Sequence, residues 1–197
     1  MEKRRWIERS GQWALAASVL AISASAFAMP PTAAMWDNGC AACHGTLGAS
    51  AGPAMPSLAG QSKEAIVAAM KSFKSGARPS TVMGRLATGY TDADFAVMGD
   101  FFAGQKLHKT QQTLDPMRVA KGASLQASKC GGCHTENGKV SNDDAPAMAS
   151  QWLLYLRMQM ALYVEGKRTT PKKMTDVIKT MSADDLESLL HFYASVK

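Results

Sequence analysis

Two Cys-x-x-Cys-His segments constrain this chain more than any other feature of its sequence. Residues 40–44 are Cys-Ala-Ala-Cys-His, and residues 130–134 are Cys-Gly-Gly-Cys-His. This spacing is typical of covalent attachment of c-type haem. On a helix, positions i, i+3 and i+4 share a face, so two thiols can form thioethers with one haem while the imidazole binds its iron. The two segments use all four cysteines, which leaves none for a disulfide.

Other uses of paired cysteines fit the sequence less well. A zinc site made from both pairs would have to bridge the 87 positions between Cys43 and Cys130, whereas zinc-binding pairs are usually about 12–20 residues apart. A thioredoxin-like dithiol needs a β-α-β context, and the sequence shows almost no strand pattern. Two covalent haems are therefore predicted. Their attachment residues are Cys40, Cys43, His44, Cys130, Cys133 and His134.

The second half of the chain repeats the first. At an offset of 90 residues, Leu-Ala-Gly-Gln at 58–61 aligns with Met-Ala-Ser-Gln at 148–151. After one inserted residue the offset becomes 91, and Met83 then aligns with Met174. Two copies with so long a period indicate two homologous domains rather than a solenoid. We expect the domains at residues 29–104 and 116–197, with a polar linker at residues 105–115.

Both halves have the pattern of amphipathic helices. Ser62 can cap a helix over residues 63–74, and Thr91 precedes an acidic first turn that opens another. The second half repeats this with a helix over residues 152–164 and another after Ser182. Apolar residues recur at helical spacing in these segments. The sequence therefore predicts an all-α fold, in which haem supplies apolar mass that so small a core would lack.

A second axial ligand for each iron must come from the rest of each half. Met83 and Met174 are equivalent, lie in a predicted loop between a Gly-x-Arg segment and the last helix, and follow their histidines by 39 and 40 residues. Met70 and Met160 are also equivalent, but they fall on apolar helix faces and are predicted core residues. The two remaining histidines have no counterparts in the other half, which disfavours bis-histidine ligation. We predict His/Met ligation, which raises the reduction potential and fills both axial positions, so that the iron passes electrons.

Residues 1–28 have the pattern of a secretory signal peptide. Four of the first nine residues are basic, namely Lys3, Arg4, Arg5 and Arg9. An uncharged apolar stretch covers residues 12–28, and Ala-Phe-Ala at 26–28 predicts cleavage after Ala28. An uncleaved membrane anchor is the alternative, although the stretch is short and rich in alanine and serine for a stable span. We expect an exported, periplasmic product without a membrane span after processing.

The charge of the chain is moderately positive. Lys and Arg number 22 against 16 Asp and Glu, for a net +6, and removal of the leader leaves +4. No dense basic tract or recognition-helix pattern supports binding to nucleic acid. Four basic residues cluster before Met174, namely Lys167, Arg168, Lys172 and Lys173. An ordinary solvated loop explains this cluster, and a basic rim that steers an acidic redox partner is the alternative.

The repeated features resemble the dihaem cytochrome c4 group over nearly the whole chain after the leader. They are Cys-x-x-Cys-His, Leu-Ala-Gly-Gln, Gly-x-Arg and the methionine segment. The resemblance implies two tandem class I cytochrome c-type domains, each wrapped around one covalent haem c. One departure is Met-Ala-Ser-Gln at 148–151, where the Leu-Ala-Gly-Gln form is lost in the second half.

A narrower similarity points to the cytochrome subunit of flavocytochrome c sulfide dehydrogenase. It is carried by Met-Gly-Arg-Leu-Ala-Thr-Gly-Tyr at 83–90, Gln-Trp-Leu-Leu-Tyr-Leu at 151–156, Lys-Lys-Met at 172–174 and Phe-Tyr-Ala-Ser at 192–195. The similarity implies a separate FAD-containing flavoprotein subunit with a redox disulfide that oxidises sulfide. Electrons would pass from the flavin to the two haems and then to an external acceptor. The axial ligands that carry over are His44, Met83, His134 and Met174.

Two other functions stay open at this point. A free-standing cytochrome c4-type periplasmic carrier would use the same residues to deliver electrons to a terminal oxidase. A catalytic haem protein such as a thiosulfate dehydrogenase would need an open or unusual iron site. In the favoured interpretation the chain is an electron-transfer subunit and is not itself the site of sulfide chemistry.

Overall fold

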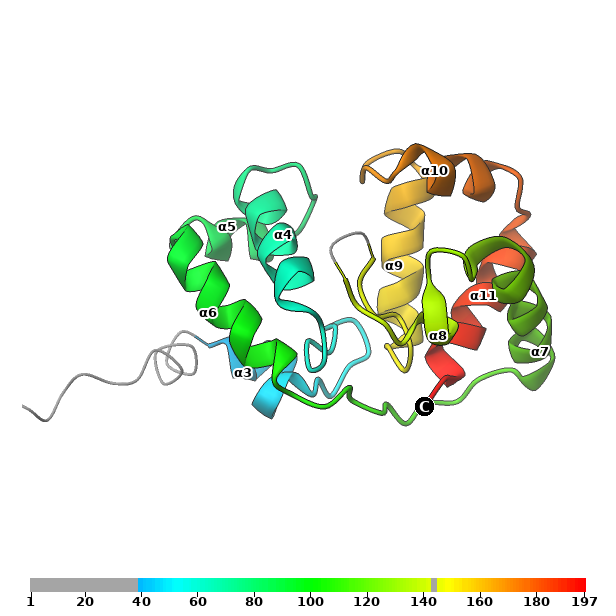
Figure 1. Ribbon diagram of the computed structural model, residues 1–197, viewed down its shortest axis with the longest axis horizontal. Helices are drawn as coiled ribbons and strands as arrows, with labels where there is room; N and C mark the ends of the chain where they lie inside the picture. The colour runs from blue at the N-terminus through cyan, green and yellow to red at the C-terminus, as the bar shows by residue number, and fades with distance from the viewer. Residues whose placement is uncertain (1–38, 143–144) are drawn as a thin grey trace, which may run out of the picture. The chain divides into compact units, whose positions relative to one another are not determined.

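The computed structural model describes residues 39–142 and 145–197, all of which lie in one compact unit. The predicted signal peptide, residues 1–28, lies outside the described residues. The described part of the chain contains helices and no β-strand, which confirms the predicted all-α class (Figure 1). Below, the first half denotes residues 39–104 and the second half residues 116–197. Residues 104–115 contain no helix.

The first half is built on two antiparallel helices with capped N-termini. Its helices are α3 (Cys40–His44), the 3-10 turn Thr46–Gly48, α4 (Lys63–Lys74), α5 (Met83–Ala87) and α6 (Asp92–Ala103). Ser62 caps α4 by accepting a hydrogen bond from the Ala65 N–H, and Thr91 forms a capping box with Asp94 at the start of α6. α4 and α6 pack against each other. Their buried side chains and Ala87 of α5 form the first core, which consists of Ile66, Met70, Ala87, Phe95, Met98 and Phe102.

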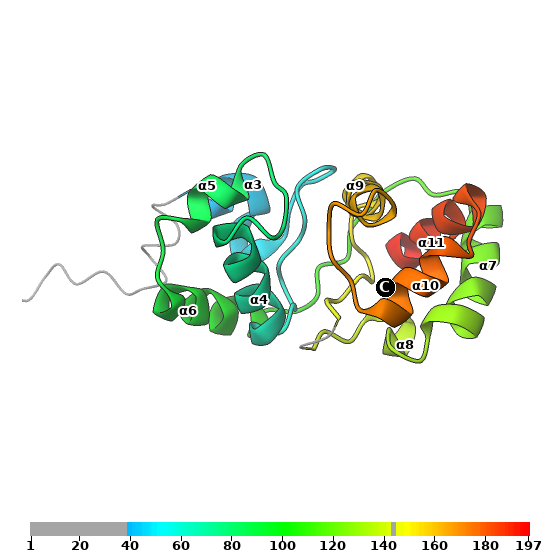
Figure 2. The same ribbon diagram turned by 90° about the horizontal axis from the view of Figure 1, so that it is seen from above.

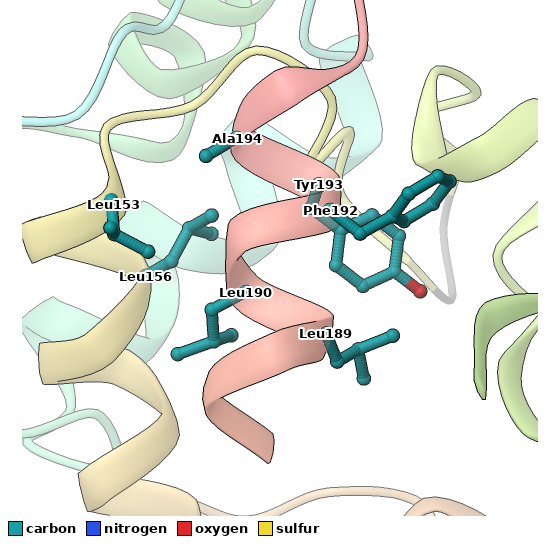
Figure 3. Close-up of a cluster of buried hydrophobic side chains, with 7 residues drawn as sticks. All are labelled: Leu153, Leu156, Leu189, Leu190, Phe192, Tyr193 and Ala194. Atoms are coloured by element: carbon teal, nitrogen blue, oxygen red, sulfur yellow. The ribbon is translucent and has the colours of Figure 1, made fainter. Parts of the chain in front are cut away.

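The second half repeats this pair and adds a helix before it. Its elements are α7 (Pro116–Leu125), the π-helical turn Gln126–Cys130, α8 (Thr135–Gly138), α9 (Leu153–Val164), α10 (Lys172–Lys179) and α11 (Ala183–Ser195). Figure 3 shows the second core, in which leucines of α9 face α11. α7 packs along α11 (Figure 2). The two helices approach closely because Gly122 has no side chain: a Cβ there would lie 2.1 Å from the Ser188 carbonyl oxygen.

The internal repeat is visible in the backbone. α4 and α9 begin and end at residues that are 90 apart. The Gly60 N–H donates to the Phe102 carbonyl at 3.0 Å, and the Ser150 N–H donates to the Tyr193 carbonyl at 2.8 Å. The same turn therefore ties the start of α4 to the end of α6 in the first half and the start of α9 to the end of α11 in the second.

This turn requires a left-handed backbone, which the halves achieve with different residues. Gly60 has φ of 78°, and a Cβ there would meet the Leu107 backbone at 2.8 Å. Ser150 adopts φ of 56° with a side chain present. Its hydroxyl accepts a hydrogen bond from the Thr110 N–H at 2.8 Å, and the Thr110 hydroxyl donates to the Ser150 carbonyl at 2.7 Å. Ser150, which replaces the glycine of Leu-Ala-Gly-Gln, thus hydrogen-bonds the linker to the second half.

Two local expectations from the sequence need correction. The segments with Met83 and Met174 are not loops: Met83 is the first residue of α5, and Met174 lies in α10. The helices α5 and α10 are only about one and two turns long, which is too short for a periodic apolar pattern to reveal them in the sequence. The helix α7 was not predicted, although Asp115 caps it and Pro116 occupies its first turn. This pair is the sequence signal that could have revealed it.

Candidate functional site

The first Cys-x-x-Cys-His segment forms the helix α3 and presents a buried histidine. His44 Nδ1 donates to the Pro56 carbonyl at 2.8 Å. Because a carbonyl can only accept, the proton lies on Nδ1 and the lone pair of Nε2 is left for a metal. Burial lowers the pKa of His44, which favours the neutral imidazole that metals bind. Cys40 and Cys43 are free thiols on the same helix.

The second segment has a different local structure. Cys130 ends a π-helical turn, Cys133 lies in the turn that follows, and His134 lies in a bend. Burial lowers the pKa of His134 as well. Its Nδ1, however, is buried and has no hydrogen-bond partner among the described residues. The Gln126 side chain instead donates to the His134 carbonyl at 2.7 Å. The two predicted proximal histidines therefore differ in the hydrogen bond that orients a metal-binding imidazole.

The predicted methionine ligands occupy equivalent short helices. Met83 is partly buried and packs against the first core. Met174 is partly buried in α10, the helix that precedes α11 as α5 precedes α6. Met70 and Met160 pack with the first and second cores. This placement fits the prediction that these two are core residues.

Two arginines meet around one glutamine where the halves contact each other. Arg78 stacks on Phe73 with 4.5 Å from the guanidinium carbon to the ring centre, and it donates to Gln159 Oε1 at 3.0 Å. Arg168 stacks on Tyr163 in the same way, at 4.6 Å, and donates to the same oxygen at 2.5 Å. Burial and the neighbouring Arg78 lower the pKa of Arg168. None of the ion pairs among the described residues includes either arginine.

These donor groups fit a haem better than a bare metal ion. Arg78 Nε is buried without a partner among the described residues, so this cationic pair is short of acceptors. Haem carries two propionates, which are suitable partners for guanidinium groups. Within residues 39–142 and 145–197, no three His, Cys, Asp or Glu side chains lie close enough to hold a metal ion. The structure thus gives no support to a zinc site that joins the two cysteine pairs.

Comparisons with known proteins agree with this chemistry. A cytochrome c family model matches residues 32–111. Cytochrome c4 from Pseudomonas aeruginosa is 32% identical over 162 residues, which cover 76% of this chain and 80% of that protein. The chain belongs to the cytochrome c4 family. The crystal structure of reduced recombinant cytochrome c4 from Pseudomonas stutzeri superposes with a TM-score of 0.74 at 26% identity, over 86% of this chain and all of that one.

A second relative is similar over a shorter stretch. The cytochrome subunit of sulfide dehydrogenase from Chlorobaculum tepidum is 48% identical over 63 residues, which cover 32% of this chain and 56% of that protein. As a member of the cytochrome c4 family, the present chain is a c-type cytochrome with haem c as cofactor and electron transfer as its function. Among its described helices, none is long and apolar enough to cross a membrane.

In this cytochrome c4 family member the two halves exchange a reciprocal pair of glutamine contacts. Gln151 Oε1 accepts from the Ser57 N–H and Gln151 Nε2 donates to the Ser57 carbonyl, both at 3.0 Å. Likewise, Gln61 Oε1 accepts from the Ala147 N–H of the other half at 3.0 Å, and Gln61 Nε2 donates to the Ala147 carbonyl at 2.8 Å. Both glutamines end the repeated segments at 58–61 and 148–151, but this role was not predicted. A single sequence carries no signal for which buried side chain crosses to the other half.

The basic cluster before Met174 is less open than its sequence suggests. Arg168 turns inward to Gln159 and does not belong to an exposed rim. Lys167 pairs with Glu165 at 2.8 Å, and Lys172 pairs with Asp176 at 2.6 Å. Exposed pairs of this kind are worth little energy, but they reduce the local positive charge. Lys167, Lys172 and Lys173 are solvated side chains, as the simpler explanation expects, although the last two lie in α10 and not in a loop.

Proposed function

We propose that this chain binds two haems c, one in each half. The haem of the first half would be held by Cys40, Cys43, His44 and Met83, and that of the second by Cys130, Cys133, His134 and Met174. A haem c with histidine and methionine ligands supplies a one-electron Fe(III)/Fe(II) couple. The domains would be residues 29–104 and 116–197, joined by residues 105–115.

The protein's own residues would prepare the iron site rather than react. The Pro56 carbonyl fixes His44 with Nε2 free, and burial lowers the pKa of His44, which favours the neutral imidazole. The paired guanidiniums of Arg78 and Arg168 offer hydrogen-bond donors to propionates. The buried side chains of α4 and α6 would exclude water from the haem of the first half, and those of α9 and α11 would do so in the second half.

For the physiological role, we propose the haem subunit of a flavocytochrome c sulfide dehydrogenase. The observation that supports it is the 48% identity to a sulfide dehydrogenase cytochrome subunit over 63 residues. A separate FAD-containing subunit would oxidise sulfide and pass electrons to the haems, which would pass them to an external acceptor. Sulfide chemistry would take place on the partner and not on this chain.

Affinity purification of the tagged chain from its native host tests this role. We expect a flavoprotein of equal stoichiometry to co-elute, and we expect added sulfide to reduce the haem absorption bands of the complex. Elution of the cytochrome alone, with haems that sulfide leaves oxidised, would contradict the role. The isolated cytochrome plus sulfide, without the flavoprotein, is the control for direct chemical reduction.

A free-standing electron carrier is the second candidate. It is favoured by cytochrome c4 of Pseudomonas aeruginosa, which this chain matches over 80% of that protein's length. Such a carrier would be purified without a flavoprotein and would be oxidised by membranes that contain a terminal oxidase. The same pull-down experiment therefore separates the two candidates.

Export to the periplasm belongs to the same proposal. Residues 1–28 would be a cleaved signal peptide, and haem would be attached outside the cytoplasm. N-terminal sequencing of the mature cytochrome should give Met29 as the first residue. An intact leader on the haem-loaded protein would contradict cleavage and favour the membrane-anchor alternative.

A further inference from the structure

The contact between Gln151 and Ser57 has a particular relation to the proximal histidine of the first half. The Ser57 N–H and the Pro56 carbonyl belong to one planar peptide unit. The carbonyl of this unit accepts from His44 Nδ1 at 2.8 Å. Its N–H donates to Gln151 Oε1, which lies in the other half, at 3.0 Å. A hydrogen-bonded chain thus runs from the second half through one peptide group to His44.

We propose that Gln151 is a positioning residue for the iron ligand His44 and tunes the potential of the haem in the opposite half. An acceptor on the N–H of a peptide polarises its carbonyl, so the carbonyl becomes a stronger acceptor for the imidazole N–H. A stronger Nδ1–H hydrogen bond makes the imidazole more basic. The more basic ligand stabilises Fe(III), so Gln151 lowers the potential of the first haem.

The surrounding contacts hold this peptide in place. Gln151 is 5% exposed, and its Nε2 also donates to the Ser57 carbonyl, so the amide grips both sides of Ser57. Trp152 Nε1 donates to the Ser50 carbonyl at 3.1 Å, and the Tyr155 N–H donates to the Pro53 carbonyl at 3.2 Å. The loop that carries the His44 acceptor is therefore fixed at three points by the start of α9.

The second half provides a matched internal control. Gln61 forms two hydrogen bonds with the Ala147 backbone, as Gln151 does with the Ser57 backbone, and residue 146 is again a proline. Yet His134 Nδ1 has no hydrogen-bond partner in the described part of the chain, so the equivalent chain of bonds is broken. Loss of either glutamine removes the equivalent pair of contacts between the halves, and loss of Gln61 also removes an acceptor of the Ser141 hydroxyl. Only loss of Gln151 also weakens a bond to a proximal histidine.

The test compares Gln151→Leu with Gln61→Leu in the full chain loaded with both haems. The midpoint potential of each haem is followed by NMR of its shifted methyl resonances during a redox titration. We expect Gln151→Leu to raise the potential of the His44 haem, by an amount that changes its ferric-to-ferrous ratio a few-fold at a fixed potential. The His44 Nδ1 proton should also exchange faster with solvent. Gln61→Leu should leave both properties of the His44 haem unchanged.

Trp152→Phe gives an independent and milder perturbation if Gln151→Leu does not fold. It removes the Nε1 donor to Ser50 and should shift the His44 haem in the same direction by less. Equal shifts of the His44 haem in the two glutamine variants would overturn the inference, because general loosening between the halves would then explain them. An unchanged potential in both Gln151→Leu and Trp152→Phe would overturn it as well.

The inference rests on the proposed function only in requiring a haem whose iron is bound by His44. A wild-type protein whose haem content shows no haem attached to Cys40 and Cys43 would overturn that assignment and the inference together. If the protein carries two haems but substitution of Gln151 leaves their potentials unchanged, the inference alone would be overturned. Neither result depends on whether a flavoprotein partner exists.

Discussion

The first and second halves of this chain use one backbone plan but orient their histidines differently. In the first half a left-handed turn ties the start of α4 to the end of α6, and in the second half such a turn ties the start of α9 to the end of α11. His44 Nδ1 donates to Pro56, whereas His134 Nδ1 has no partner among the described residues. The comparison shows that the two halves share the left-handed turn and the capping box of the last helix, which define the fold. The hydrogen bonds that tune each site diverge more easily.

The largest expected effect concerns the axial methionines. Met83→Leu and Met174→Leu should each remove the methionine-to-iron absorption band of one haem and lower the potential of that haem strongly, because the thioether ligand raises it. Absorption spectra and redox titration of each variant check this outcome. Met70→Leu is the control, since it replaces a core methionine of α4 and should leave both bands in place. Intact bands in both ligand variants would show that the ligands are wrongly assigned.

The left-handed turn gives the next largest effect, and it should be unequal between the halves. Gly60→Ser places a Cβ 2.8 Å from the Leu107 backbone at a positive φ, so we expect a loss of about 2–4 kcal/mol of unfolding free energy. Ser150→Gly relieves the positive φ but loses a hydrogen bond with Thr110, so the net change should stay within about 1 kcal/mol. Denaturant unfolding of the haem-loaded variants measures both. Similar losses at the two positions would show that the close contact with Leu107 is not decisive.

A smaller difference should appear between the wild-type haems. The hydrogen bond from His44 to Pro56 makes that imidazole more basic, and His134 lacks such a partner among the described residues. We therefore expect the haem of the first half to have the lower potential. NMR during a redox titration should therefore show the second-half haem reduced first. The opposite order would mean that burial or charge outweighs the proximal hydrogen bond.

The long helices of both halves and the cofactor were predictable from the sequence. The Ser62, Thr91 and Ser182 caps and the apolar periods predicted the long helices, because these signals are local. The Cys-x-x-Cys-His spacing predicted the cofactor by itself. The predicted methionine loops were wrong because the short α5 and α10 lack a long periodic pattern.

The finer features of the site could not be predicted in this way. The grip of Gln151 on Ser57 joins residues 94 positions apart, and only packing of the two halves brings them together. Both halves carry a proline at the equivalent position, Pro56 and Pro146, so the sequence gives no reason to expect different histidine hydrogen bonds. The two histidines also lie in different backbone structures, since Cys40–His44 forms a helix and His134 lies in a bend, and the shared motif does not indicate this difference.

The smallest effect distinguishes the capping boxes of the last helices. Asp94 and Asp185 occupy the same position, but Lys121 of α7 also contacts Asp185, at 2.6 Å. Lys121 and Ser182 lower the pKa of Asp185 to about 2, while the Thr91 hydroxyl and backbone lower that of Asp94. Both carboxylates therefore stabilise the fold above their unfolded pKa of about 4. This contribution is lost as the pH falls through the folded pKa, which for Asp185 is near 2.

Lys121→Gln separates the two contributions. It should raise the pKa of Asp185 because the capping box then acts without the ammonium group, and it should leave Asp94 unchanged. Carbon-13 NMR titration of the side-chain carboxyl groups measures both values in one sample. If the pKa of Asp185 stays near 2 in this variant, the box alone explains it, and α7 adds no acid resistance to the last helix of the second half.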